Sequence, residues 1–176
     1  MATLRIEAGT LTTGSASSFQ QINFASEFNS VPVVMTTLTS FNDTNAVTGR
    51  VRDIAIDGFR YRMQEQESYT QDHKAETLSY VSWEPSFGEI GGITYRVRRT
   101  ADAVRHKNYA IQFDEPFVTP PVFIAAMQTA DGGDTANVRY SSKDGGSVEV
   151  LIDEEASRDS ESNHTTEVVG YMAFSR

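Results

Sequence analysis

The sequence contains no cysteine among its 176 residues. This absence excludes disulfide bridges, thiolate catalysis and a cysteine-ligated zinc ion. It does not decide the compartment, because a β-protein without cysteine is stable inside or outside a cell.

Long apolar runs are also missing. No segment approaches the roughly 20 apolar residues that a membrane-crossing helix needs. The polar start MATLRIEAGT lacks the basic and apolar regions of a signal peptide. We therefore expect no membrane insertion and no signal peptide in this chain. We expect an extracellular or surface-displayed protein, either secreted or part of a virion. Such a protein would be present here in its mature form or would be exported by a route that needs no signal peptide.

Positive charge is scarce. Fifteen Lys and Arg residues face twenty-four Asp and Glu residues, which gives a net charge of −9 and a pI near 4.8. Binding to a phosphate backbone needs a positive surface, so this balance excludes nucleic acid as a partner.

Catalytic signatures are absent from the sequence as well. It has no Gly-x-Ser-x-Gly elbow, no phosphate-binding loop and no dinucleotide fingerprint. Glu65 and Glu76 could be imagined as the carboxylate pair of a glycosidase, but the same pair recurs later in the chain, which a shared packing role explains more simply. We expect a protein that is not an enzyme and requires no cofactor.

What the sequence does contain is an internal duplication. A shift of 89 residues superimposes one half on the other, and a two-residue insertion raises the shift to 91 near the end of the unit. The first shift pairs Ile22 with Ile111, Phe24 with Phe113, Phe28 with Phe117, Pro32 with Pro121, Val33 with Val122, Arg50 with Arg139 and Glu65 with Glu154. The second shift pairs His73 with His164, Glu76 with Glu167 and Tyr80 with Tyr171.

Each copy has the pattern of short strands. VPVVMTTLTS and PPVFIAAMQT are apolar, β-branched runs entered through proline, and GFRYRM and SVEVLI alternate as half-buried strands do. Turn-forming stretches rich in Asn, Asp and Gly separate them. We predict an all-β fold of two tandem small antiparallel β-sandwiches, over residues 1–86 and 87–176.

The order of core and turn residues resembles the H-type lectin domain of snail agglutinins and of the discoidin C-terminal domain. The matching positions are Phe24, Phe28, Pro32, Val33, Arg50, Gly58, Phe59, Ser82 and Trp83. The resemblance implies six-stranded sandwiches that form homotrimers and bind N-acetylgalactosamine-type sugars between subunits. The Trp-His pair of the lectin sugar site is replaced by QEQES in the first copy and DEEAS in the second, so the resemblance extends to the fold more than to the ligand.

Candidate ligand-binding residues lie in two equivalent loops, 42–50 and 131–139, where the resemblance would place clefts between subunits. They are Asn42, Asp43, Arg50, Asp131, Asp134 and Arg139.

A duplicated polar set takes the place of the Trp-His pair. It consists of Arg50, Glu65, His73 and Glu76, matched by Arg139, Glu154, His164 and Glu167. Carboxylates with an imidazole suit calcium or another divalent metal. The alternatives are direct contact with a ligand and a buried hydrogen-bonded network, since buried charged groups are normally paired. The network interpretation places Glu65 and Glu76 on neighbouring strands within reach of Arg50.

Two functions follow from these observations. The first is a non-catalytic, lectin-like module that binds glycans and serves adhesion or recognition on a cell or virion surface. The second is a structural subunit of a spike, fibre or filament, which uses the sandwich for assembly and needs no sugar.

Overall fold

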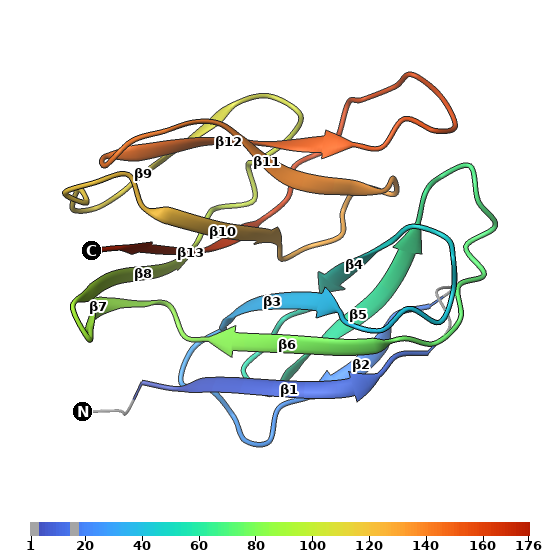
Figure 1. Ribbon diagram of the computed structural model, residues 1–176, viewed down its shortest axis with the longest axis horizontal. Helices are drawn as coiled ribbons and strands as arrows, with labels where there is room; N and C mark the ends of the chain where they lie inside the picture. Colours follow the sequence, from blue (N-terminus) through green and yellow to red (C-terminus); the bar gives the residue numbers. More distant parts are fainter. Residues whose placement is uncertain (1–3, 15–17) are drawn as a thin grey trace.

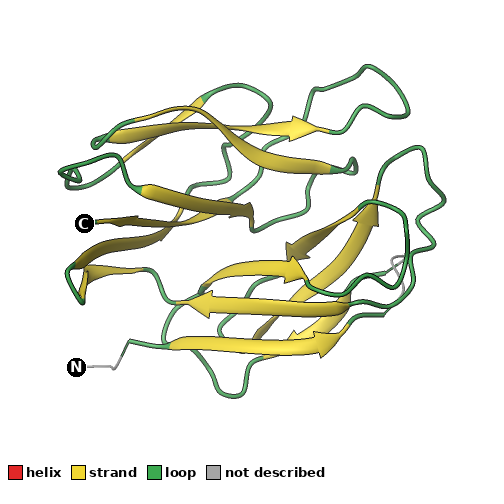
Figure 2. Ribbon diagram, viewed as in Figure 1, coloured by secondary structure: helices red, strands yellow, loops and turns green. Residues whose placement is uncertain are grey.

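The computed structural model describes residues 4–14 and 18–176, and within these ranges every regular element is a β-strand (Figure 1 and Figure 2). The predicted all-β fold is therefore confirmed. The strands are β1 (Ile6–Thr12), β2 (Gln20–Asn23), β3 (Val33–Leu38), β4 (Val47–Arg52), β5 (Gly58–Glu65), β6 (Thr77–Trp83), β7 (Ser86–Ile90), β8 (Ile93–Arg99), β9 (Tyr109–Gln112), β10 (Val122–Met127), β11 (Ala136–Lys143), β12 (Ser147–Glu154) and β13 (Val169–Ser175).

The strands form four antiparallel sheets, and each sheet takes its strands from one half of the chain. The orders are β1-β6-β3 and β2-β5-β4 in the first half, and β10-β13-β8-β7 and β11-β12-β9 in the second. In Figure 1 the blue-to-green half lies below the yellow-to-red half. The two sheets of each half face one another as a sandwich.

The core of each sandwich lies between its two sheets, because alternate residues of a strand point to the same face. In the first sandwich Phe59, Tyr61 and Met63 of β5 meet Leu78 and Tyr80 of β6. In the second, side chains from β12 and β13 fill the same layer. Both cores hold an edge-to-face phenylalanine pair, Phe24–Phe28 with ring centroids 4.7 Å apart and Phe113–Phe117 with centroids 5.0 Å apart.

The sequence pattern did not predict β7, the strand that follows the change from one half to the other. β7 forms a hairpin with β8 through Gly91 and Gly92, whose φ angles of 59° and 77° suit the two-residue turn of a hairpin. Ser86 already pairs with Val97 in this hairpin. The change from one set of sheets to the other therefore falls between Trp83 and Ser86, slightly before the predicted boundary at 86/87.

The two sandwiches pack against each other through β3. A small apolar cluster joins Val33 of β3 to Tyr95 and Val97 of β8 and Met172 of β13. Beside it the amide of Gln128 hydrogen-bonds both the N–H and the C=O of Val34, at 2.8 and 2.9 Å. The side chain of Gln128 thus stands where a neighbouring strand would, and it satisfies part of the unpaired edge of β3.

A leucine at position 170 should weaken this packing. A Cβ at Gly170 would lie 2.6 Å from the side chain of Gln128 and 2.8 Å from Val33. Overpacking of this kind costs about 2 kcal/mol, so Gly170→Leu should lower the free energy of unfolding by that amount. The control is Ser79→Leu, at the equivalent position of the first sandwich. Equal losses in urea titrations of the two variants would contradict the tight contact at Gly170.

Candidate functional site

A Glu–His–Glu network closes one end of the first sandwich. His73 lies between two carboxylates, with Nδ1 3.0 Å from Glu65 Oε1 and Nε2 3.3 Å from Glu76 Oε1. All three side chains are at most 2% exposed. Glu65 ends β5 and Glu76 precedes β6, so the imidazole ties together strands from opposite sheets.

The second sandwich repeats the network with equivalent residues. His164 Nδ1 lies 2.5 Å from Glu154 Oε1, and His164 Nε2 lies 3.0 Å from Glu167 Oε1. Glu154 ends β12 and Glu167 precedes β13. The prediction that Glu65 and Glu76 lie on neighbouring strands is wrong, because β5 and β6 belong to different sheets. Contact is made through the histidine instead.

Each network also anchors a loop of its own sandwich. In the first sandwich this is the loop after β3, and in the second it is the loop after β10. Glu76 accepts hydrogen bonds from the Ser40 hydroxyl and from the backbone amides of Asn42 and Asp43, the latter at 2.7 and 3.2 Å. Glu167 accepts them from the Thr129 hydroxyl and from the amides of Asp131 and Gly132, both at 3.0 Å. Each glutamate thus satisfies part-buried backbone donors of a turn that has no strand partner.

Arg50 does not join the network of its own sandwich. Its guanidinium crosses to the second sandwich, where Nη2 lies 3.0 Å from Glu167 Oε1 and Nη1 lies 2.9 Å from the Asp134 carbonyl oxygen. Both side chains of this ion pair are 0% exposed. Gln64 supports the contact by donating to the Gly133 carbonyl at 2.7 Å. The expectation that Arg50 lies within reach of Glu65 and Glu76 is therefore wrong.

Arg139, the repeat equivalent of Arg50, has a different environment. Its side chain is 67% exposed and pairs with Asp153 of the neighbouring strand at 3.3 Å. Among the described residues, no contact joins it to Glu154, His164 or Glu167. The prediction that both arginines belong to the duplicated set is wrong for Arg139 as it is for Arg50.

The ionisation of the second network follows from its contacts. Burial on its own lowers the pKa of His164, but hydrogen bonds to Glu167 and Glu154 outweigh it, and the pKa lies above 6.5. Burial on its own raises the pKa of Glu167, but His164, Thr129, the Gly132 amide and the charge of Arg50 hold the pKa below 4.5. The second network is thus a buried chain of contacts that runs from Arg50 through Glu167 and His164 to Glu154.

These directions predict how stability depends on pH. Because the pKa of His164 is raised on folding, its contribution is complete below pH 6.5 and is lost as the pH rises through the folded-state value. Because the pKa of Glu167 is lowered, its contribution is present above pH 4.5 and is lost as the pH falls through the folded-state value. The network should stabilise the fold most between pH 4.5 and 6.5. Urea titrations of the wild type and His164→Gln should differ more in this range than at alkaline pH; a constant difference would contradict the assignment.

The other candidate ligand residues lie in the two anchored loops. The side chain of Asn42 donates a hydrogen bond to the Ala75 carbonyl, and the carboxylate of Asp43 accepts hydrogen bonds from the backbone amides of Thr44 and Lys74. Asp131 and Asp134 are exposed. Loop 131–134 contacts Arg50 and Gln64, so the structure brings it to the junction between the sandwiches.

Asp134 also belongs to a group that was not foreseen. One carboxylate oxygen from each of Asp134, Glu154 and Glu161 lies within 4.8 Å of the others. Oxygen ligands of this kind suit calcium. Asp134 and Glu161 are exposed and acidic residues cluster on the surface of many proteins without a metal, so the group identifies no metal site by itself. The sequence separates these residues by up to 27 positions, from Asp134 to Glu161, which gives no motif to detect.

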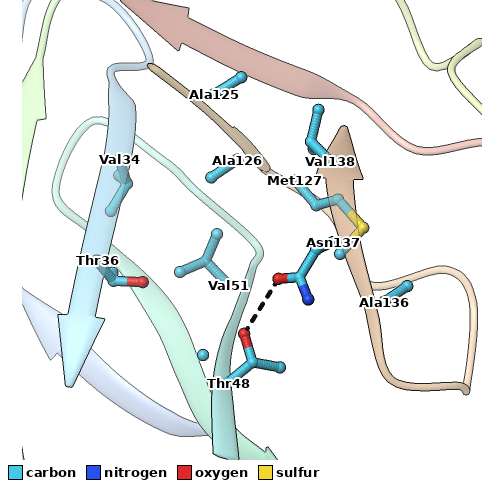
Figure 3. Close-up of a pocket in the computed structure, with 11 residues that line it drawn as sticks. Val34, Thr36, Thr48, Val51, Ala125, Ala126, Met127, Ala136, Asn137 and Val138 are labelled. Atoms are coloured by element: carbon cyan, nitrogen blue, oxygen red, sulfur yellow. Dashed lines mark hydrogen bonds between the residues drawn. The ribbon is translucent and has the colours of Figure 1, made fainter. Parts of the chain in front are cut away.

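A pocket of about 180 Å³ lies at the junction of the sandwiches, between β3 and β4 on one side and β10 and β11 on the other. Figure 3 shows that apolar side chains such as Val34, Val51 and Val138 line it. A hydrogen bond 3.4 Å long joins two of its lining residues, Thr48 and Asn137, across the junction. No titratable side chain lines this pocket, so it offers packing space and no acid–base chemistry.

Comparisons with known proteins find a relative but no matching family model. No family model matches the chain, and no solved structure matches it. The chain is similar to "Halomucin" from Haloquadratum walsbyi (strain DSM 16790 / HBSQ001), with 30% identity over 175 residues. The match covers 97% of this chain but only 2% of the length of that protein. Within residues 4–14 and 18–176 there is no helix that could cross a membrane.

Proposed function

We propose that this chain is a non-catalytic structural module of an extracellular or surface-displayed protein, in which two sandwiches act as one rigid unit. The observation that carries the proposal is the use made of the charged residues. The arginine, histidine and glutamates that suggested a ligand site are buried in contacts that hold loops and sandwiches together.

The similarity to Halomucin supports this proposal in two ways. The relative's name describes a mucin, which fits a surface role. The alignment takes in nearly all of this chain and a small fraction of the relative, as expected if the paired sandwich is a building unit of much larger proteins.

Labelling of intact cells or particles tests the proposed location. Antibodies against the purified chain should label the source cells or virions without permeabilisation, and an antibody against an internal protein serves as the control. Labelling that appears only after permeabilisation would contradict the proposal.

Glycan binding is a second candidate function, favoured by one surface feature. An open groove of about 620 Å³ runs between β10 and β11, and its lining includes Arg139 and Tyr140. The Tyr140 side chain is 54% exposed. An exposed aromatic ring beside an arginine offers a stacking surface and hydrogen-bond donors for a sugar.

A glycan array with and without a chelator tests this second function. Saturable binding that Tyr140→Ala abolishes, and that Tyr69→Ala in the other sandwich leaves intact, would establish it. A chelator effect would implicate the group of Asp134, Glu154 and Glu161. Binding that survives Tyr140→Ala, or no binding at all, would refute a site in this groove.

A further inference from the structure

We infer that the outer face of the sheet β2-β5-β4 binds an anionic polysaccharide, whose sulfate or carboxylate groups pair with Arg52, Arg60 and Arg62. We call this surface the arginine face. The inference goes beyond the proposed structural role. It concerns a different surface from the groove beside Arg139 and Tyr140.

Positive charge is concentrated on two neighbouring strands of an acidic chain. The whole chain has a net charge of −9, yet β4 and β5 hold four of its fifteen Lys and Arg residues. These four are Arg50, Arg52, Arg60 and Arg62. Successive residues of a strand point to opposite faces of the sheet. Because Val51, Tyr61 and Met63 belong to the core, the arginines beside them lie on the outer face.

The strand register sets these arginines directly opposite one another. Arg50 pairs with Arg62, and Arg52 pairs with Arg60, across β4 and β5. Like charges at such positions destabilise a sheet. Arg50 has a buried partner in Glu167 of the second sandwich. The other three arginines lie on the part of the face where an external anion can relieve the repulsion.

One carboxylate serves these three arginines among the described residues. Asp53 Oδ2 lies 3.3 Å from Arg52 Nε and 3.9 Å from Arg60 Nε. Arg62 forms no ion pair within residues 4–14 and 18–176. Burial and the positive charge of Arg52 both lower the pKa of Arg62, but an arginine remains protonated at physiological pH. Positive charge on the arginine face therefore exceeds the negative charge that the chain supplies.

Phe19, just before β2, holds two of the guanidinium groups in place. Arg52 Cζ lies 4.0 Å from the centroid of the Phe19 ring, and Arg62 Cζ lies 4.8 Å from it. Such cation–π contacts restrict the side chains without neutralising their charge. Because the guanidinium groups are already positioned, they lose less conformational entropy when they bind an anion.

The second sandwich shows that the fold does not need these arginines. The repeat shift of 89 places Ser141, Glu149 and Leu151 at the positions of the three free arginines. Glu149 there accepts hydrogen bonds from the side chains of Asn108 and Ser141. The equivalent sheet β11-β12-β9 forms with this different set of side chains. The arginines of the first sandwich therefore point to binding and not to folding.

The surroundings of the arginines favour a polysaccharide over nucleic acid. Gln21 and Asn23 of β2 are exposed, and Gln21 pairs with Arg60 across the sheet. Their amides offer donors and acceptors for sugar hydroxyls. DNA carries one negative charge per about 1.7 Å of its axis. A protein with a net charge of −9 repels such a polymer more strongly than one with widely spaced charges.

Immobilised dextran sulfate and polygalacturonate test the inference, because they present sulfate and carboxylate groups respectively. The wild type should bind at least one of these polymers saturably, and it should not bind uncharged dextran. Sodium chloride should weaken the binding, because exposed charges are screened by salt. The stronger of the two polymers identifies the anion that the arginine face prefers.

Arg52→Ser with Arg62→Leu introduces the residues that the second sandwich holds at these positions. The affinity should fall at least about tenfold, because two charge-assisted contacts are lost. Arg105→Ser with Lys107→Ser is the matched control. It removes the same two positive charges from an exposed loop between β8 and β9 and should leave the affinity nearly unchanged.

Arg60→Glu tests the arginine face independently of the double variant. Its side chain is 48% exposed, and Glu149 holds the equivalent position in the second sandwich, so the fold should tolerate the change. The reversed charge should weaken binding severalfold. Thermal unfolding shows whether each variant is folded.

Four results would overturn the inference. They are a wild type that binds neither anionic polymer, folded arginine variants that bind like the wild type, a control variant that loses as much affinity as the arginine variants, and equally tight binding of double-stranded DNA at the same salt concentration. The labelling of intact cells does not depend on this binding, so failure here would leave the proposed surface location standing.

Discussion

Glu167→Ala should lower the free energy of unfolding by about 4 kcal/mol, because breaking a buried ion pair leaves its partner charge uncompensated. Arg50 would keep its contacts with the carbonyl oxygens of Gly132 and Asp134. It would lose the only carboxylate that forms an ion pair with its guanidinium among the described residues. The amides of Asp131 and Gly132 and one nitrogen of His164 would also lose their acceptor.

Glu76→Ala is the matched control. Glu76 contacts the equivalent histidine, hydroxyl and loop amides, but no arginine reaches it. Glu76→Ala should therefore lower the free energy of unfolding clearly less than Glu167→Ala does. Urea titrations between pH 4.5 and 6.5, where the second network should stabilise the fold most, measure both variants. Equal losses would mean that the Arg50–Glu167 pair adds nothing to stability.

The strands and the histidine networks could be predicted because both depend on local or repeated information. Alternation in GFRYRM places Phe59, Tyr61 and Met63 on one face, and the structure buries all three. His73 and Glu76 are three residues apart, and the repeat keeps His164 and Glu167 at the same spacing. A duplicated polar set of this kind indicates a contact that both copies retain.

The role of Arg50 could not be predicted in this way, because the repeat assigns the same residue to two different environments. Arg50 faces a neighbouring sandwich, whereas Arg139 faces water. The sequence holds one difference that is informative in retrospect. Gln64 in the first copy corresponds to Asp153 in the second, and this aspartate gives Arg139 a partner on its own sheet.

The arrangement of the sheets explains the other error. Sequence order suggested that Glu65 and Glu76, at the ends of consecutive strands, lie side by side. In a sandwich, consecutive strands often belong to opposite sheets, and β5 and β6 do so. The gap between the sheets is bridged by His73, whose ring reaches both carboxylates.

Arg50→Ala should lower the free energy of unfolding by about 3 kcal/mol, which is at the lower end of the range for a broken buried ion pair. Glu167 would still accept hydrogen bonds from His164, Thr129 and two backbone amides, so less charge is left uncompensated than in Glu167→Ala. Burial lowers the pKa of Arg50, and the charge of Glu167 opposes this, so the pair contributes to stability as two charged groups.

Arg139→Ala supplies the comparison at the equivalent position. The side chain of Arg139 is largely exposed and its ion pair with Asp153 lies on the surface. The free energy of unfolding should therefore change by no more than about 0.5 kcal/mol. Arg50→Lys keeps the charge but loses the planar guanidinium group, which reaches Glu167 and two loop carbonyls together. Its loss of unfolding free energy should lie between those of Arg50→Ala and Arg139→Ala. Urea titrations give the three energies, and hydrogen exchange at Gly132 and Val34 shows whether the sandwiches separate. If Arg50→Ala and Arg139→Ala have equal effects, the buried pair does not hold the two sandwiches together.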